Sequence, residues 1–497
     1  MGIIQQQTLK GTFYSYLGVL IGFLSVYLLQ PKVLSPEQVG LIGLLGLFPI
    51  LFAQFSVLGF NATARIFPYF RDGKTHDHGY LGLACLISIV GFAIFMVLVA
   101  LFKDEIVQQK TSGSNLFDQY FWYLIPLTFF TLFFNVFELY ARMLYDTTTG
   151  RILTEFAKRL FVLIALLLLL FSILDFAYFM WAWLLANIIP TGILMYRLHQ
   201  RNQLSFRVDF KFLTPVIRKQ MIQLSVFGIL TGASPFIIAN ADMYMINKAF
   251  GLRNTGIYSL AFAFATIISL PARSLYSIAY TVIAQAWKDN DMAGIASVYR
   301  KSCISQIIST LFLFTLIWVN IENIYHVLPP EYAAGRYVIF FVGLGYLIDA
   351  STGVNGVILS TSKYYKYDSF FNFSLIAITI GANLIFIPLY GITGAAIASA
   401  LTFFIFNLAR YLFILFVFKL QPFNYNTPLV LLTGVVTYYL VHFIPALPNF
   451  IADGIMRTGL VTVLFGGTVY YSKFSQDINN LIDSSLLKVK NIIGMNK

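Results

Sequence analysis

The sequence predicts an all-α polytopic membrane protein with fourteen transmembrane helices, arranged as two six-helix lobes related by a parallel internal repeat plus two C-terminal helices. Of its 497 residues, 58% are hydrophobic and only 11% are charged, whereas an average soluble domain is about 25% charged. Long apolar runs recur along the chain, each near the roughly 20 residues with which a helix crosses a hydrocarbon core of about 30 Å. The predicted spans are 11-29, 38-60, 79-102, 119-140, 157-174, 176-196, 222-246, 256-284, 302-320, 337-360, 370-389, 391-418, 428-447 and 455-472.

The distribution of positive charge between alternate loops supports this topology, because Lys and Arg are retained on the cytoplasmic side. With the N-terminus inside, and with cations toward the span ends counted with the adjoining loop, the inner loops and tails hold 25 of the 33 Lys and Arg residues and the outer loops hold 7, which leaves Arg273 within a span. We therefore expect both termini to be cytoplasmic. The net charge of +12 then faces anionic lipid headgroups, and no nucleic-acid partner is needed to explain it. The first run has no basic segment and cleavage site, which predicts a retained span.

An internal repeat appears when the chain is shifted by 216 residues, which places span 1 on span 7 and span 6 on span 12. Gly40 in "KVLSPEQVGLIGLLGLF" then falls on Gly256 in "KAFGLRNTGIYSLAFAF". Six spans per copy give both copies the same orientation, so their pseudo-axis lies along the membrane normal. The predicted domains are an N-lobe over 1-196, a cytoplasmic linker over 197-221, a C-lobe over 222-418, spans 13 and 14 over 419-472, and a cytoplasmic amphipathic tail over 473-497. The cation-rich linker is either a surface connection or a platform for an anionic lipid.

Polar residues inside the spans are ranked by depth, because a charge near the bilayer centre costs about 2.5 to 3.5 kcal/mol. Asp242 lies near the outer end of span 7, roughly 30 Å from the inner edge, which makes it a gating or helix-end residue. Glu138 and Arg142 form an i,i+4 pair at an interface, which structure alone explains. Arg273 lies about 25 Å into span 8 and Asp349 about 18 Å into span 10. These two carry the functional hypothesis.

A polar stripe follows span 8 at helical spacing. Its members are Thr266, Ser269, Arg273, Tyr276, Ser277 and Tyr280. One interpretation is structural, with Arg273 neutralised by Asp349 or by backbone carbonyls. The other is that Arg273 binds an anionic group of a transported molecule, since a planar guanidinium donates two hydrogen bonds to phosphate.

The sequence contains no set of residues typical of a soluble enzyme. There is no Gly-Lys-Ser phosphate loop, so ATP hydrolysis is not expected. His76 and His78 lie on an inner loop, where solvation is favoured over metal binding. Cys85 and Cys303 are interpreted as small buried hydrophobic residues. We expect no catalytic residue, no metal and no cofactor.

The fourteen spans, the two six-span copies and the segments "YGITGAAIASALTF" and "ADMYMINKAFGLRNTGIYSLAF" resemble the multidrug/oligosaccharidyl-lipid/polysaccharide exporter superfamily. Within it, the chain looks like the bacterial polysaccharide-biosynthesis flippases that move undecaprenyl-diphosphate-linked oligosaccharides such as O-antigen units. Span 1 lacks the acidic residue that drug and cation antiporters of the superfamily often use in that lobe.

This resemblance implies a flippase that carries a lipid-linked oligosaccharide from the inner to the outer leaflet of the bacterial inner membrane, by alternating access of two lobes. The product would serve cell-surface polysaccharide such as lipopolysaccharide, and a polysaccharide polymerase is an expected partner alongside membrane lipids. Arg273 would bind the diphosphate, with Tyr276, Tyr280, Ser269 and Ser277 as further substrate contacts. Asp349 and Asp242 would serve coupling or gating. The alternatives are a cation-coupled multidrug antiporter and, less favoured, a membrane glycosyltransferase or ligase, for which the outer loops are short.

Overall fold

The computed structural model describes residues 3–72, 75–108, 115–232 and 234–492, and within them some side chains, including those of Arg273 and Ser277, lie outside the description. The described residues form helices and connecting loops with no strand. Two compact units divide the chain, residues 1–259 and 260–497. The boundary lies inside one long helix, and the predicted domain limits stay predictions.

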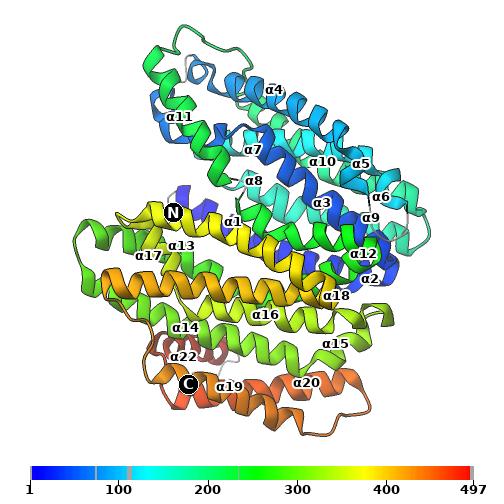
Figure 1. The fold of residues 1–497 in the computed structure, drawn as a ribbon, viewed down its shortest axis with the longest axis vertical. Coiled ribbons are helices and arrows are strands. Elements are labelled where there is room, and N and C mark those ends of the chain that lie inside the picture. The colour runs from blue at the N-terminus through cyan, green and yellow to red at the C-terminus, as the bar shows by residue number, and fades with distance from the viewer. Residues whose placement is uncertain (1–2, 73–74, 109–114, 233, 493–497) are drawn as a thin grey trace. The chain divides into compact units, whose positions relative to one another are not determined.

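Unit 1 is a layered helical bundle (Figure 1). Its helices are α1 Ile3–Phe23, α2 Gln30–Val33, α3 Pro36–Ser56, α4 Tyr80–Leu101, α5 Lys103–Val107, α6 Leu116–Gln119, α7 Leu124–Met143, α8 Thr149–Ile152, α9 Lys158–Leu170, α10 Phe176–Gln200, α11 Pro215–Gly232 and most of α12 Ser234–Thr266. Ser35 begins α3 with a capping box, in which its hydroxyl accepts from the Gln38 backbone N–H and its own N–H donates to the Gln38 side chain. The core packs α3, α4, α7 and α10 around buried aromatic rings such as Phe67, Tyr80 and Tyr140.

Unit 2 holds the rest of the chain. Its helices are α13 Leu270–Lys288, α14 Met292–Val319, α15 Ile321–Val327, α16 Arg336–Ser351, α17 Asn355–Thr361, α18 Tyr365–Phe418, α19 Asn426–His442, α20 Phe450–Val461, α21 Gly467–Tyr471 and α22 Gln476–Ile492. Helix α14 packs against α13, α16, α19 and α20, and α16 runs along α18. The 54-residue α18 changes direction at Gly391, where φ is 60°, which is where the sequence separates spans 11 and 12.

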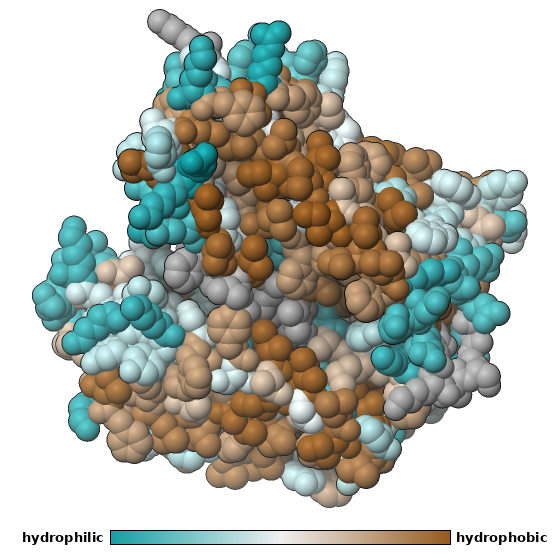
Figure 2. All heavy atoms as spheres, turned by 45° about the horizontal axis from the view of Figure 1, so that its top comes forward, coloured by the Kyte–Doolittle hydropathy of each residue, from teal (hydrophilic) through white to brown (hydrophobic). Residues whose placement is uncertain are grey.

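Every predicted span contains helix, with Ala233 outside the described residues. Among the described residues, ten helices are long and apolar enough to cross a membrane. The number of crossings therefore stays a prediction. Hydrophobic residues cover much of the visible surface in Figure 2. Exposed large apolar side chains elsewhere along the chain include Val97, Trp181 and Leu384, at 59%, 57% and 64%. Such a surface is stable against lipid, not water.

A reciprocal contact joins α3 to α12 within unit 1. A Cβ atom on Gly40 would lie 2.2 Å from the carbonyl oxygen of Leu252, and one on Gly256 would lie 1.9 Å from that of Pro36. The predicted repeat register superposes Pro36 on Leu252 and Gly40 on Gly256. Gly40 thus meets Leu252, and their repeat equivalents, Gly256 and Pro36, meet in the same way. Such an exchange of equivalent contacts is what a two-fold axis produces. This geometry supports the predicted parallel repeat.

Two smaller predictions are confirmed. Arg142 donates to Glu138 at 2.8 Å across one turn, and both cysteines are free and buried. His78 differs from the expectation of a solvated side chain, because it stacks on Phe212 with ring centroids 3.9 Å apart. In the tail helix α22, Ile478 packs against the core, and the amphipathic character of the tail stays a prediction.

Candidate substrate and coupling site

The predicted span 10 is a broken helix. Helix α16 ends at Ser351 and α17 begins at Asn355, and between them Gly353 adopts φ 58°. Glycine is required there because a side chain would be strained at this φ and its Cβ would lie 2.9 Å from the Ser302 hydroxyl. Discontinuous helices near the middle of the membrane are where transporters commonly bind substrates and coupling ions.

Side chains from neighbouring helices satisfy the carbonyl groups that the break releases. The Tyr276 hydroxyl of α13 donates to the Gly353 carbonyl at 3.2 Å. The Cys303 thiol of α14 donates to the Ser351 carbonyl at 3.0 Å. Because unsatisfied backbone groups are costly in hydrocarbon, these contacts stabilise an interruption that was not predicted from the sequence.

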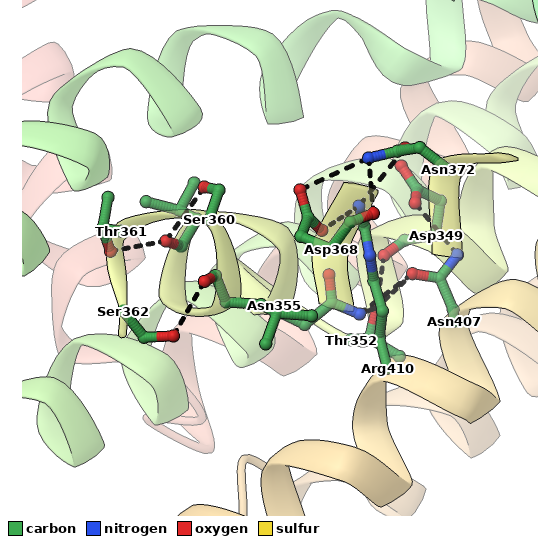
Figure 3. A network of polar contacts seen from close by, with 12 residues as sticks. Asp349, Thr352, Asn355, Ser360, Thr361, Ser362, Asp368, Asn372, Asn407 and Arg410 are labelled. Carbon is green, nitrogen blue, oxygen red and sulfur yellow. Dashed lines mark hydrogen bonds and ion pairs between the residues drawn. The ribbon is translucent and has the colours of Figure 1, made fainter. Parts of the chain in front are cut away.

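Asp349, on the last turn of α16, belongs to a hydrogen-bonded network at this break (Figure 3). The Asn407 amide donates to the Asp349 carboxylate at 3.0 Å. The Asn407 carbonyl accepts from the Thr352 hydroxyl at 2.9 Å and from the Asn355 amide at 3.0 Å, and Asn355 also donates to Thr352 at 2.9 Å. One asparagine of α18 therefore joins both sides of the break.

A second polar group lies beside the first and includes an ion pair. Arg410, one turn beyond Asn407 on α18, lies 2.5 Å from the Asp368 carboxylate, and the two side chains are 11% and 15% exposed. Asn372 donates to the Asp368 carboxylate at 3.3 Å. The Arg410 guanidinium also lies over the Phe406 ring, 4.0 Å from its centroid. Its buried Nε makes no hydrogen bond within the described part of the chain.

These two groups have distinct chemical capacities. Asp349 with Asn407, Thr352 and Asn355 is a cluster of oxygen and amide groups that can accept a proton or a hard cation through the carboxylate. Arg410 is a permanent cation that is already neutralised by Asp368. The first group is therefore suited to coupling, and the second to holding the two halves of α18 together.

The predicted stripe on span 8 is divided in the structure. A 3-10 turn, Ile267–Ser269, separates α12 from α13, and Pro271 lies in the first turn of α13. Ser269 is buried and donates to the Thr266 carbonyl. Tyr276 reaches the break in span 10, whereas Tyr280 is 54% exposed. The side chains of Arg273 and Ser277 lie outside the described ones, so the roles proposed for them, and the pairing of Arg273 with Asp349, stay predictions.

Asp242 is buried in unit 1, with 2% of its surface exposed. The Tyr258 hydroxyl donates to its carboxylate at 2.7 Å. These residues lie on opposite sides of Gly251, where α12 has φ 80° and ψ −178°. The contact ties the two halves of α12 together, and the helix-end and gating roles of Asp242 stay predictions.

Sequence reasoning missed Asn407, Asp368 and Arg410. The loop-charge count assigns Arg410 to an inner loop, although it lies within α18 and pairs with a carboxylate. The available signal was the spacing of Asn407 and Arg410, three residues apart in an apolar span and therefore on one helix face.

Comparisons with known proteins agree with this architecture. The structure is similar to one described as the lipid II flippase MurJ in an inward closed conformation, with a TM-score of 0.70 and 12% identity over 94% of this chain and 99% of that one. It is also similar to an inward-facing multidrug resistance MATE family transporter of the MOP superfamily, with a TM-score of 0.63 and 14% identity over 87% of this chain and 96% of that one. A MOP superfamily transporter from Pyrococcus furiosus matches with a TM-score of 0.53 and 14% identity over 82% and 92% of the two chains.

The chain therefore shares the fold of these solved flippase and transporter structures. No family model matches this sequence. No curated protein matches it either.

Proposed function

We propose that this protein is a flippase that moves a lipid-linked oligosaccharide from the inner to the outer leaflet of a bacterial cytoplasmic membrane, for cell-surface polysaccharide biosynthesis. The observation that carries the proposal is the similarity to a lipid II flippase across 94% of the chain. The lipid tail stays in the bilayer while the headgroup passes between the lobes. A polysaccharide polymerase then consumes the product.

Arg273 is the residue we assign to the diphosphate of the substrate. It is the one Lys or Arg that the loop-charge count assigns to no loop or tail, and a planar guanidinium binds phosphate oxygens two at a time. Ser269 before it and Tyr276, Ser277 and Tyr280 after it lie at helical spacing and supply hydroxyl groups for sugar. Asp349 supplies coupling, because its carboxylate lies at the break in span 10 among groups that stabilise its charged form.

The test replaces Arg273 by alanine in the source strain and measures surface polysaccharide by immunoblot, with the amount of protein in the membrane measured in parallel. We expect polymer export to be lost. Arg273→Lys keeps the positive charge but lacks the paired N–H donors of the guanidinium, so this variant should export only part of the normal amount of polymer. Arg253→Ala, on an outer loop by the predicted topology, is the matched control and should export normally. Normal polysaccharide in the Arg273→Ala strain would refute the assignment.

A second function, cation-coupled multidrug export, is favoured by the similarity to a MATE family transporter and by the Asp349 cluster. A strain that lacks the gene separates the two. Hypersensitivity to lipophilic cations with unchanged polysaccharide supports the drug pump, whereas lost polysaccharide with unchanged drug sensitivity supports the flippase.

A further inference from the structure

A groove of about 470 Å³ runs between α13, α14 and the tail helix α22 in unit 2. Apolar residues form most of its wall, and polar residues cluster on the α14 side. We call it the tail-helix groove. Its lining residues are Pro271, Leu275, Ile278, Ala279, Val282, Val298, Lys301, Ser302, Ser305, Gln306, Ser309, Asp477, Ile478 and Leu481.

The length of the tail-helix groove matches one leaflet of a membrane. Its wall extends from Pro271 to Val282 on α13 and from Val298 to Ser309 on α14, about 16 Å along each helix axis. Half of a hydrocarbon core of about 30 Å is about 15 Å. A single acyl chain lying parallel to the helices therefore fills it.

Gln306 gives this groove an unmet hydrogen-bonding demand. Its side chain is only 1% exposed, and within the described part of the chain neither its amide nitrogen nor its carbonyl oxygen has a partner. Leaving such a group unpaired in a membrane is unfavourable. Ser302 and Ser309, on the same wall, already donate to carbonyls of their own helix, so each still offers a hydroxyl oxygen as an acceptor. An occupant with its own polar groups at this depth satisfies Gln306.

Two opposite charges lie at the mouth of the groove. Lys301 of α14 and Asp477, in the first turn of α22, both line it and are exposed, and no ion pair joins them among the described side chains. The loop-charge count puts this end of α14 on the cytoplasmic side. Gln306 is about 7 Å deeper than Lys301 along α14. Along α14 the groove therefore presents Lys301 nearer the surface, Gln306 deeper and Ser309 deepest, and the apolar residues of α13 line it over its whole length.

We propose that the tail-helix groove holds one phospholipid of the cytoplasmic leaflet with a primary-ammonium headgroup, of the phosphatidylethanolamine type. Its acyl chain fills the apolar wall, and its ester and glycerol oxygens accept from Gln306. Its phosphate pairs with Lys301 and its ammonium with Asp477. The lipid fixes α22 against α13 and α14 and is distinct from any transported molecule, so the proposal does not depend on the flippase function.

The test is native mass spectrometry of the full-length protein, delipidated in detergent and titrated with phosphatidylethanolamine, phosphatidylglycerol or phosphatidylcholine. We expect one phosphatidylethanolamine to bind in preference to the other two. Gln306→Leu should weaken binding about tenfold, the loss of one or two hydrogen bonds, and Ser309→Phe, which fills the groove, should abolish it. Asp477→Asn should remove the preference over phosphatidylglycerol, and Lys301→Gln should weaken both. Equal binding of all three lipids to the unmodified protein would overturn the proposal.

Thr310→Val is the matched control. Thr310 is buried one turn beyond Gln306 on α14 and its hydroxyl is also unpartnered among the described residues, yet it does not line the groove. Its substitution should leave lipid binding unchanged, and a loss equal to that of Gln306→Leu would count against the site.

A measurement on the unmodified protein avoids any dependence on how variants fold. Phosphatidylethanolamine with a diazirine on its acyl chain should label peptides from 271–282 and 298–309. Labelling confined to other lipid-facing helices would refute the proposal even if all variants bound lipid as expected.

Discussion

Replacing Asn407 by leucine tests whether one side chain of α18 stabilises the break in span 10. Leucine has the same number and branching of side-chain heavy atoms, so the shape is largely retained while every hydrogen bond of the amide is lost. The bonds to Asp349, Thr352 and Asn355 cross between helices. The fourth bond, to the Phe403 carbonyl, stays within α18 and contributes to no contact between helices.

The magnitude follows from counting these bonds. The Thr352 hydroxyl has one hydrogen and also lies 3.0 Å from the Asp349 carbonyl, so its bond to Asn407 counts as half of one. That leaves about two and a half bonds between helices, at about 0.6 to 1.7 kcal/mol each in a membrane protein. The Asp349 carboxylate loses its amide donor as well. We expect the variant to lose about 2 to 4 kcal/mol of unfolding free energy.

The measurement is reversible unfolding of the purified protein in mixed micelles, with transport activity assayed in parallel. Asn187→Leu is the matched control, because the Asn187 amide donates only to the carbonyl of Trp183 on its own helix. It should cost less than about 1 kcal/mol. Equal losses in the two variants would refute the idea that Asn407 braces the break.

Two further changes test charged groups. Asp368→Asn and Arg410→Met should each cost about 3 kcal/mol of unfolding free energy, because each leaves a poorly hydrated charge without its partner. The double variant Asp368→Leu with Arg410→Met should cost less than either single change. Thermal unfolding of all three variants decides this, and additive losses would contradict it. For Asp146, on an inner loop, burial alone would raise the pKa, but hydrogen bonds from Thr149 and the charge of Arg201 outweigh burial and hold the pKa below its ordinary value. A carboxyl whose pKa is lowered by folding stabilises the protein at pH values above its unfolded-state pKa, which is near 4. This stabilisation is lost as the pH falls through the folded-state pKa. Asp146→Asn should therefore be less stable than the unmodified protein near pH 7, and the gap should close below about pH 4; a gap that is constant with pH would exclude this linkage.

The positions of the helices could be predicted from the sequence because the hydrocarbon core sets the length of an apolar run. The boundary at Gly391 was placed correctly for this reason, since a small residue interrupts two adjacent runs. The break at Gly353 was not predicted. Polar residues and glycines cluster around it in "DASTGVNG", residues 349–356, but the prediction used only the length and mean apolarity of the run. The groups that stabilise the break, Tyr276 and Cys303, are distant in sequence.

The candidate site was predicted only in part for a similar reason. The distance of each residue from the end of its span singled out Asp349, because that distance alone identifies a charge near the bilayer centre. Depth says nothing of partners. Asn407 is neutral, so a search for charges inside the spans did not select it. Arg410 was assigned to an inner loop and expected to be solvated, although its side chain is only 11% exposed. Pairing is a property of the packed helices, so it emerges only from the structure.

The contact between Gly40 and Gly256 leads to a prediction about symmetry. Each glycine faces a backbone carbonyl of the other helix at a distance that leaves no room for a methyl group. Overpacking of this kind costs about 1 to 3 kcal/mol, while alanine gains up to about 1 kcal/mol over glycine within a helix. If a two-fold axis relates α3 to the second half of α12, Gly40→Ala and Gly256→Ala should destabilise unit 1 by similar amounts, near 1 to 2 kcal/mol. Gly46, also on α3, has no heavy atom within 4 Å of the position that an added methyl group would occupy, so Gly46→Ala should be neutral or stabilising in the same unfolding measurement. A large loss at one of the paired glycines with none at the other would contradict the reciprocal geometry on which the repeat now rests.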